Sequence, residues 1–367
     1  MPLKGKIDFR SDTFTEPTPE MRHAMATCEV GDDVWELDPT VKELEALGAK
    51  ITGMEASLFM PSSIMANLVA VMTHTTGRGE EMLIGDKSHL SLYEQGHIST
   101  IAAVHARTVT NFDDGTFDIE ELKMKIRPPG NFHFPRTSLV CLESSHNMCS
   151  GSAIPVEFIR KVQEAIKGKN IKLHIDGARM FNATTALGIS PIEYLKGVDS
   201  INFCLSKALC APIGAMLAGS KEFIDRARYI RKGLGGGLRQ AGVIACCGII
   251  ALRDMVGRLG DDHARARRLY EGLKAIDGVQ LRRADTNIVM FDLNKEIFKG
   301  ASLGGVVKEL NKHNVYMYPV DDDRVIRAVV HYHITDEDIE KSIVAVKSVL
   351  SAIRLGSVHV DIVDRNF

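Results

Sequence analysis

Two ionisable residues stand where apolar runs of the chain end, and both suit chemistry on a bound aldehyde. Lys207 follows the run 201–205 and Ser206, and Asp176 closes the run 171–175. A lysine kept partly neutral by burial can form an imine with an aldehyde, and pyridoxal phosphate is the commonest such partner. A carboxylate such as Asp176 would keep the ring nitrogen of that cofactor protonated. Each residue alone also has a plainer interpretation, Lys207 as an amine extended to water and Asp176 as a helix N-cap.

The elements that must position these residues follow from the alternation of apolar strand and amphipathic helix patterns. Strands are predicted at 58–60, 82–85, 138–143, 171–175, 201–205 and 215–218, with helices at 64–71, 118–126, 156–166 and 221–231. Such alternation is typical of an α/β fold with a mainly parallel, doubly wound sheet. Ligands bind such sheets beyond the carboxyl ends of the strands. The residues predicted at that edge are His89, His146, Asp176, Arg179 and Lys207.

Two further stretches could bind an anion. Ser62, Ser63 and Ile64 lie between a predicted strand and a helix, where first-turn N–H groups and the helix dipole converge. A Ser N-cap alone explains that turn equally well. The Gly-rich loop 233–240 could bring backbone N–H groups and Arg239 to an anion, within the chain or across a subunit interface, or could be only a flexible turn.

Changes of pattern along the chain predict its organisation. Residues 1–40 are polar and turn-rich and are expected to form an N-terminal arm, with a helix starting at Thr40 as N-cap. Residues 41–260 are expected to form a large cofactor-binding domain. After residue 260 the rhythm changes to strands at 279–281, 287–291 and 325–330 with helices at 303–312 and 336–351, which predicts a smaller α+β domain over 261–367.

The composition and charge of the chain argue against some classes of partner and favour one cellular compartment. The 367 residues carry a formal net charge of −2 with no strongly basic or acidic block, so neither a nucleic acid nor a membrane surface is expected as a partner. The N-terminus lacks an apolar signal-peptide core, and no apolar run reaches transmembrane length. Seven scattered cysteines without CxxC spacing favour a reducing cytoplasmic setting and no metal site.

Several strings in order along nearly the whole chain resemble the low-specificity L-threonine aldolases, enzymes of fold type I among the pyridoxal-phosphate proteins. The resemblance rests on the strings Phe9–Thr13, Gly31–Val34, Asp38–Thr40, Tyr93–Gly96, His174–Arg179, Ser206–Lys207, Ala211–Gly214 and Gly235–Gly242, and extends to the Arg327 strand. It implies a fold type I structure and the cleavage of L-threonine or L-allo-threonine to glycine and an aldehyde. It also implies a homo-oligomer, a tetramer or a dimer.

The resemblance assigns roles to individual residues. Lys207 would bind the cofactor aldehyde, Asp176 its ring nitrogen, and His89 would stack on its ring. His146 or His89 would take the proton of the substrate hydroxyl. The cofactor would also be bound by Ser62, Ser63, Ile64, Arg179 and Ser206, and Arg239 would approach its phosphate. The substrate carboxylate would be held by Ser11, Arg179 and Arg327.

Two departures from the family pattern bear on affinity and reaction. Ser63 and Ile64 stand where the family has Gly-Thr, so a phosphate-binding hydroxyl is missing and a Cβ is added at the turn. Trp35-Glu36-Leu37 replaces Tyr-Gly-Glu, which could change the substrate that fits. Two alternatives therefore stay open: another pyridoxal-phosphate reaction (β-elimination, racemisation or transamination), or a scaffold that no longer binds the cofactor.

Overall fold

The computed structural model describes residues 5–75 and 78–361, which divide into two compact units. One unit comprises residues 16–257, and the other comprises 5–15 together with 258–361. This division differs from the expected arm over 1–40 and the expected boundary at 260. The reason lies in the first strand, β1 (Ile7–Asp8), which pairs in parallel with β11 (Val315–Tyr316). Phe9 then buries its side chain in the core of the same unit.

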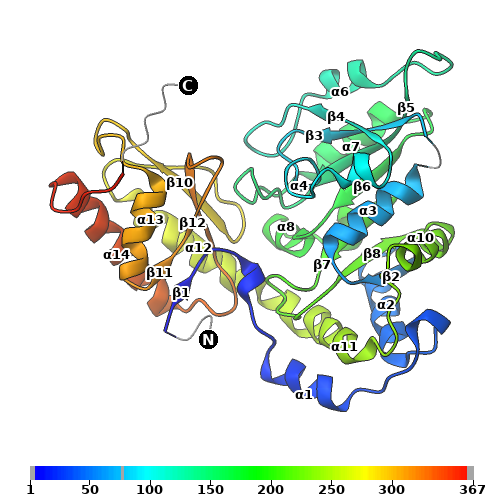
Figure 1. The fold of residues 1–367 in the computed structure, drawn as a ribbon, viewed down its shortest axis with the longest axis horizontal. Coiled ribbons are helices and arrows are strands. Elements are labelled where there is room, and N and C mark those ends of the chain that lie inside the picture. Colours follow the sequence, from blue (N-terminus) through cyan, green and yellow to red (C-terminus); the bar gives the residue numbers. More distant parts are fainter. Residues whose placement is uncertain (1–4, 76–77, 362–367) are drawn as a thin grey trace. The chain divides into compact units, whose positions relative to one another are not determined.

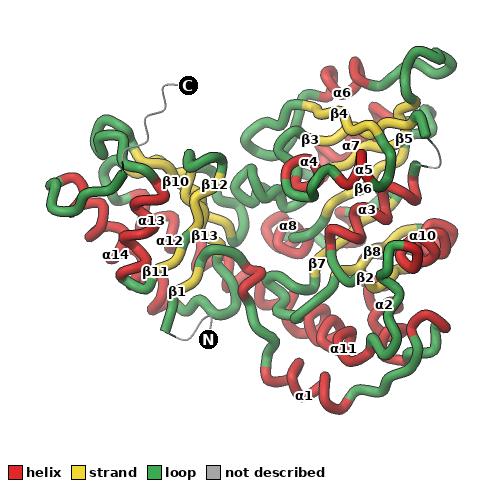
Figure 2. The backbone as a smooth tube through the Cα atoms, viewed as in Figure 1, coloured by secondary structure: helices red, strands yellow, loops and turns green. Residues whose placement is uncertain are grey.

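Seven strands of unit 16–257 form one sheet with the order β2-β8-β7-β6-β5-β3-β4 among the described residues (Figures 1 and 2). Neighbours from β7 to β4 run parallel, whereas β8 is antiparallel to both β7 and β2. The predicted mainly parallel sheet is therefore confirmed, with β4 as a strand that the sequence patterns did not reveal. The bounds are β2 (Ala56–Met60), β3 (Glu80–Gly85), β4 (His105–Val109), β5 (Arg136–Glu143), β6 (Lys172–Asp176), β7 (Ser200–Cys204) and β8 (Ala215–Gly219).

Helices cover both faces of this sheet. Leu58 and Leu217 face α3 (Ser63–His74) and α10 (Lys221–Gly233) in one apolar cluster. Ser57 and Met216, which point the other way because side chains alternate along a strand, lie against Gly48 of α2 (Pro39–Thr52). Among the described residues, the remaining α-helices of this unit are α1 (Pro19–Thr27), α4 (His89–Leu92), α5 (His97–Thr100), α6 (Ile119–Lys125), α7 (Val156–Ile166), α8 (Met180–Leu187), α9 (Pro191–Tyr194) and α11 (Gly242–Ile250).

The start of the chain corrects two sequence expectations. Residues 19–27 form helix α1, with Thr18 as N-cap and Pro19 in the first turn, where the expected arm was irregular. Helix α2 is capped by Asp38 rather than Thr40, because Pro39 suits the first helical position and the Asp38 carboxylate accepts the N–H of Val41. The Thr40 hydroxyl instead donates to the carbonyl of Glu29.

The other unit is an α+β domain built on a four-stranded antiparallel sheet with the order β12-β13-β10-β9 among the described residues. Its core contains Phe9, Val289, Phe291, Leu310 and Val346. The elements are β9 (Val279–Leu281), β10 (Ile288–Leu293), β12 (Tyr318–Val320), β13 (Val325–Val329), α12 (Leu259–Lys274), α13 (Leu303–Lys312) and α14 (Asp336–Arg354). Across residues 5–75 and 78–361, no helix combines the length and apolar character needed to span a bilayer.

Candidate active site

Three adjacent parallel strands bring their carboxyl ends together. The register pairs Glu143 at the end of β5 with Asp176 at the end of β6, and Asp176 with Asn202 of β7. The half-buried Lys207 follows β7 after two intervening residues. This is the edge at which parallel α/β sheets bind ligands, and it is where the sequence placed Asp176 and Lys207.

Asp176 is fully buried and its carboxylate is held by two donors. Asn67 of α3 donates from Nδ2 to Oδ2 at 3.0 Å, and the N–H of Ala178 donates to Oδ1 at 3.1 Å. Burial, followed by the charges of Glu143 and Glu94, raises the pKa of Asp176 to about 6, while His89 and Lys207 act in the opposite direction. Lys207 is thus close enough to influence the carboxylate, as an imine-forming lysine beside its pyridinium partner would be.

Glu94 joins Asp176 and His89 in one cluster. Its Oε1 accepts from Asn67 Nδ2 at 2.8 Å and lies 2.7 Å from His89 Nδ1, and its Oε2 lies 3.1 Å from His97 Nε2. Burial opposes the charged form of His89, but the hydrogen bond to Glu94 and the charges of Asp176, Glu143 and Glu94 raise its pKa. The backbone N–H of His89 donates to Glu143 at 2.6 Å, which fixes the start of α4 beside the strand ends.

The start of α3 lies beside this cluster and presents first-turn N–H groups. Ser62 is the N-cap, its Oγ accepting from Met65 N, while the N–H groups of Ser63 and Ile64 precede the first intrahelical bonds. The Ser63 hydroxyl oxygen accepts from Asn202 Nδ2 at 2.7 Å, so it is anchored to β7. Ser63 lies within a regular helix and outside the left-handed region, so its Cβ does not strain the turn.

His146 is buried in the loop after β5, and neither of its ring nitrogens has a hydrogen-bond partner among the described residues. The neighbouring Ser145 Oγ is buried and unpartnered in the same part of the structure. Burial lowers the pKa of His146, and Lys87 adds to that effect, whereas Glu143 and Asp86 oppose it. Buried polar atoms without partners are rare, so this loop is a place where a ligand would complete the hydrogen bonding.

Arg179 and Arg239 have different surroundings. Arg179 is buried at the N-terminus of α8, with Nη1 3.5 Å from Asn147 Oδ1. Arg239 is exposed and pairs with Asp32 at 3.0 Å. Its Gly-rich loop nevertheless lies beside the start of α3, because a Cβ on Gly236 would come within 2.5 Å of Met65 Sδ.

Ser11 and Arg327 belong to the unit formed by residues 5–15 and 258–361. The Ser11 hydroxyl oxygen accepts from Thr13 N and caps the 3₁₀ turn η1 (Asp12–Phe14). Arg327 lies in β13, and its Nη2 donates to the carbonyl of Arg10 at 3.1 Å. The two residues are therefore neighbours within their unit, and their place at a substrate carboxylate remains a prediction of the resemblance.

Three polar residues of the cluster were not predicted as site residues: Asn67, Glu94 and Glu143. Glu94 falls in one of the strings that carry the family resemblance, and Glu143 ends a predicted strand, so both had a signal in the sequence. Asn67 had none, because its importance depends on which face of α3 packs toward Asp176.

Comparison with known proteins places the chain in a family. The family model described as beta-eliminating lyase matches residues 8–296. The chain is 44% identical to a probable low-specificity L-threonine aldolase 2 of Arabidopsis thaliana, covering 91% of this chain and 94% of that one. It is 38% identical to a low specificity L-threonine aldolase of Escherichia coli K12, covering 91% and 96%.

The fold is shared with solved structures. A solved structure of Leishmania major threonine aldolase superposes with a TM-score of 0.80 at 17% identity, over 94% of this chain and 99% of that one. The fold class expected from the sequence, fold type I, is confirmed. The chain belongs to the beta-eliminating lyase family and, within it, to the group of low-specificity L-threonine aldolases.

Proposed function

We propose that the protein binds pyridoxal 5′-phosphate and cleaves L-threonine or L-allo-threonine to glycine and acetaldehyde. The observation that carries the proposal is the buried Asp176 with Lys207 acting on it at the carboxyl edge of the sheet. Relatives with 38–44% identity are named as low-specificity L-threonine aldolases, and this supports the substrate class.

The residues around this edge fit the cofactor. Lys207 would hold its aldehyde carbon, Asp176 its ring nitrogen, and His89 would lie against its ring. The first turn of α3 with Ser62, together with Ser206, would hold the phosphate through N–H groups and hydroxyls. The unpartnered polar atoms of Ser145 and His146 support the fit, since a ligand would give them partners.

When bound, the cofactor supplies an electron sink for the pair of electrons left when the Cα–Cβ bond breaks. The chain's residues would orient the substrate and move its protons. Arg179 would hold the substrate carboxylate, because a guanidinium matches a carboxylate with two parallel hydrogen bonds. His146 would accept the proton of the β-hydroxyl, since its lowered pKa keeps the ring neutral and able to accept.

The proposal is tested by the absorption of the purified protein and by its products. We expect a visible band that borohydride abolishes and that Lys207→Ala lacks. Absence of the band even with added pyridoxal phosphate would overturn cofactor binding. Incubation with threonine and with allo-threonine should give glycine and acetaldehyde, whereas 2-oxobutanoate would indicate β-elimination and a different reaction on the same site.

We further propose a cytoplasmic homo-oligomer, a tetramer or a dimer, in which Arg239 approaches the phosphate of its own or a neighbouring subunit. All seven cysteines are free thiols, which agrees with a reducing compartment. Trp35 and Leu37 are 73% and 65% exposed beside the Arg239–Asp32 pair, which supports an interface there.

A further inference from the structure

A row of buried and half-buried polar side chains runs through the unit 16–257 from the amino ends of β6 and β7 to Asp176. His74 Nε2 lies 2.6 Å from Ser200 Oγ, and Ser200 Oγ lies 2.8 Å from His174 Nδ1. His174 Nε2 lies 3.3 Å from Asn67 Oδ1, and Asn67 donates to Asp176 at 3.0 Å. Ser200, His174 and Asn67 have no exposed surface. The proposed function uses none of His74, Ser200 and His174.

The direction of every hydrogen bond in this row follows from the contacts of Asn67 with the carboxylates of Asp176 and Glu94. Asn67 Nδ2 faces two carboxylate oxygens, of Asp176 and Glu94, so the amide can have only this orientation and its Oδ1 faces His174. An amide oxygen only accepts, so His174 must carry its proton on Nε2 and leave Nδ1 as an acceptor.

The outer half of the row follows from that tautomer. The Ser200 hydroxyl must donate its single proton to His174 Nδ1, so it accepts from His74 Nε2–H. All donations then point toward Asp176. Both rings are neutral, because burial lowers the pKa of His74 and of His174 to about 3.

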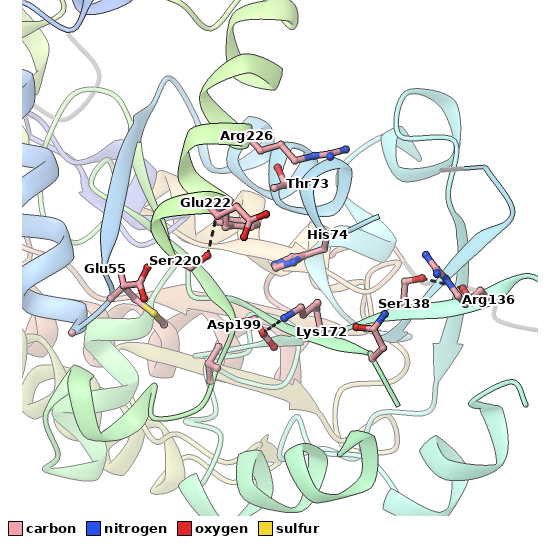
Figure 3. Close-up of a pocket in the computed structure, with 16 residues that line it drawn as sticks. Glu55, Thr73, His74, Arg136, Ser138, Lys172, Asp199, Ser220, Glu222 and Arg226 are labelled. Carbon is pink, nitrogen blue, oxygen red and sulfur yellow. Dashed lines mark hydrogen bonds and ion pairs between the residues drawn. The ribbon is translucent and has the colours of Figure 1, made fainter. Parts of the chain in front are cut away.

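The outer end of the row reaches a cavity of about 620 Å³ at the amino ends of the strands. His74 points into this cavity with Lys172 and Asp199 nearby, and Arg136 and Ser138 line its wall (Figure 3). Lys172 pairs with Asp199 at 2.8 Å, and its charge adds to the effect of burial on His74. Neutral His74 stacks on Phe223 with ring centroids 4.5 Å apart.

We propose that His174, Ser200 and His74 are positioning residues for the cofactor's ring nitrogen: they fix Asn67 so that it donates to Asp176 and keeps that carboxylate anionic. Without a donor on Oδ1, the Asn67 amide keeps its orientation, because Nδ2 still faces two carboxylate oxygens, but it is held from one side only and its hydrogen bond to Asp176 is weakened. The charged groups that act on Asp176 directly are Glu143, Glu94, His89 and Lys207, and none of them changes in the variants below. The inference rests on the proposed role of Asp176, and one of its tests needs no cofactor.

The first test is a neutron crystal structure at pH 7.5. We expect deuterium on Nε2 and not on Nδ1 of both His74 and His174, and the Ser200 deuterium directed at His174. Deuterium on Nδ1 of His174, or a Ser200 hydroxyl directed at His74, would overturn the assigned direction. This outcome is independent of whether the protein binds pyridoxal phosphate or cleaves threonine.

The second test measures the affinity for pyridoxal phosphate against pH in His174→Phe and Ser200→Ala. Loss of one hydrogen bond should raise the Kd about 3- to 10-fold at pH 7.5 in His174→Phe. The acidic limb of binding should move to higher pH, because Asp176 then loses its proton less readily. Ser200→Ala, which removes only a hydroxyl, should also raise the Kd and move the acidic limb to higher pH, in each case by less than His174→Phe.

Ser138→Ala is the matched control. Ser138 is buried beside the same cavity, but its hydroxyl donates to the carbonyl of Arg136 and has no part in the row. The affinity of Ser138→Ala for pyridoxal phosphate and the pH profile of that binding should equal those of the wild type. Unchanged profiles in both row variants would overturn the proposal. A wild-type protein that fails to bind pyridoxal phosphate would instead overturn the proposed function and leave the neutron test to decide the row.

Discussion

In the proposed function, Asp176 keeps a negative charge although its surroundings oppose that charge. It is buried, and Glu143 and Glu94 add like charges, so its pKa is raised to about 6 from an ordinary value of 3.8. The donors Asn67 and Ala178 compensate only in part. A cationic ring nitrogen would supply the missing opposite charge, so the carboxylate is better suited to the cofactor-bound protein than to the free one.

The raised pKa of Asp176 predicts how the cofactor-free protein responds to pH. Between about pH 4 and 6 the folded protein holds a proton that the unfolded chain has lost, so stability falls as pH rises through this window. Relative to Asp176→Asn, the wild-type free energy of unfolding should fall by about 2–3 kcal/mol from pH 4 to pH 7. Urea unfolding of both proteins at a series of pH values measures this difference, and a constant difference would contradict it.

His146 leads to a prediction about the reaction itself. Replacing its ring in His146→Gln should lower kcat for threonine cleavage by about 10²–10⁴-fold, with a smaller change in KM. Because burial lowers the pKa of His146, the wild-type kcat should hold steady as the pH falls through 6.5. Acetaldehyde release against pH measures both. His133→Gln, at an exposed loop position, should behave as wild type, and an equal loss there would point to a nonspecific effect.

At the scale of single residues, a candidate site residue could be predicted from the sequence when it stood at the end of a predicted strand. Asp176 and Lys207 follow apolar runs, and parallel strands must end at one edge. The contact between Asn67 and His174 could not be predicted from the sequence, because it joins a helix face to a strand 107 positions away. Periodicity predicts that such residues are buried but not which polar groups meet.

At the scale of elements, the proposed phosphate site depends on the first turn of α3. Its first turn offers N–H groups, and Ser63 Oγ accepts from Asn202 while keeping its own proton to donate, but the Ile64 side chain is 44% exposed without a polar group. Position 64 therefore lacks the hydroxyl that the resembling family has there. The cost is that of one hydrogen bond to a charged group, about 1.5–3 kcal/mol.

Ile64→Thr should restore that hydrogen bond. We expect the Kd for pyridoxal phosphate to fall by about 10- to 100-fold, because a hydroxyl at this position can reach the bound phosphate. Ile64→Val keeps a β-branched apolar side chain and is the matched control, with an unchanged Kd. Fluorescence or absorption titration of the cofactor-free variants measures both. A similar Kd in Thr and Val variants would mean that the phosphate does not approach this turn.

Helices and strands could be predicted where their own residues show an apolar periodicity. Helix α7 has a wide apolar face, and its bounds were predicted as observed. Helix α1 was missed because only Met21 of its nine residues is buried, so it has no apolar stripe to detect. Strand β4 was missed because it lies at the edge of the sheet and four of its five residues are not buried.

At the scale of the whole molecule, the segment 33–37 exposes apolar side chains, and ion pairs hold this part of the chain in place. Asp33 forms a buried ion pair with Arg231 at 2.8 Å, and Arg231 also donates to the carbonyl of Phe59. The neighbouring Asp32 pairs with Arg239. Trp35 and Leu37 are therefore exposed from an ordered loop, which is the arrangement expected of an interface that receives a second copy of the chain.

The oligomer proposal predicts that this loop controls assembly. Trp35→Glu combined with Leu37→Glu should shift the molar mass measured by light scattering from a multiple of 40.4 kDa toward 40.4 kDa, because two charges would be buried in the interface. Trp35 is the chain's single tryptophan, so its emission should also lie to the blue in the wild-type assembly and shift to the red on dilution. Met124→Glu, which is 78% exposed in α6, should leave the mass unchanged. An assembly that withstands the double substitution would place the interface elsewhere and leave Arg239 to act, if at all, within its own subunit.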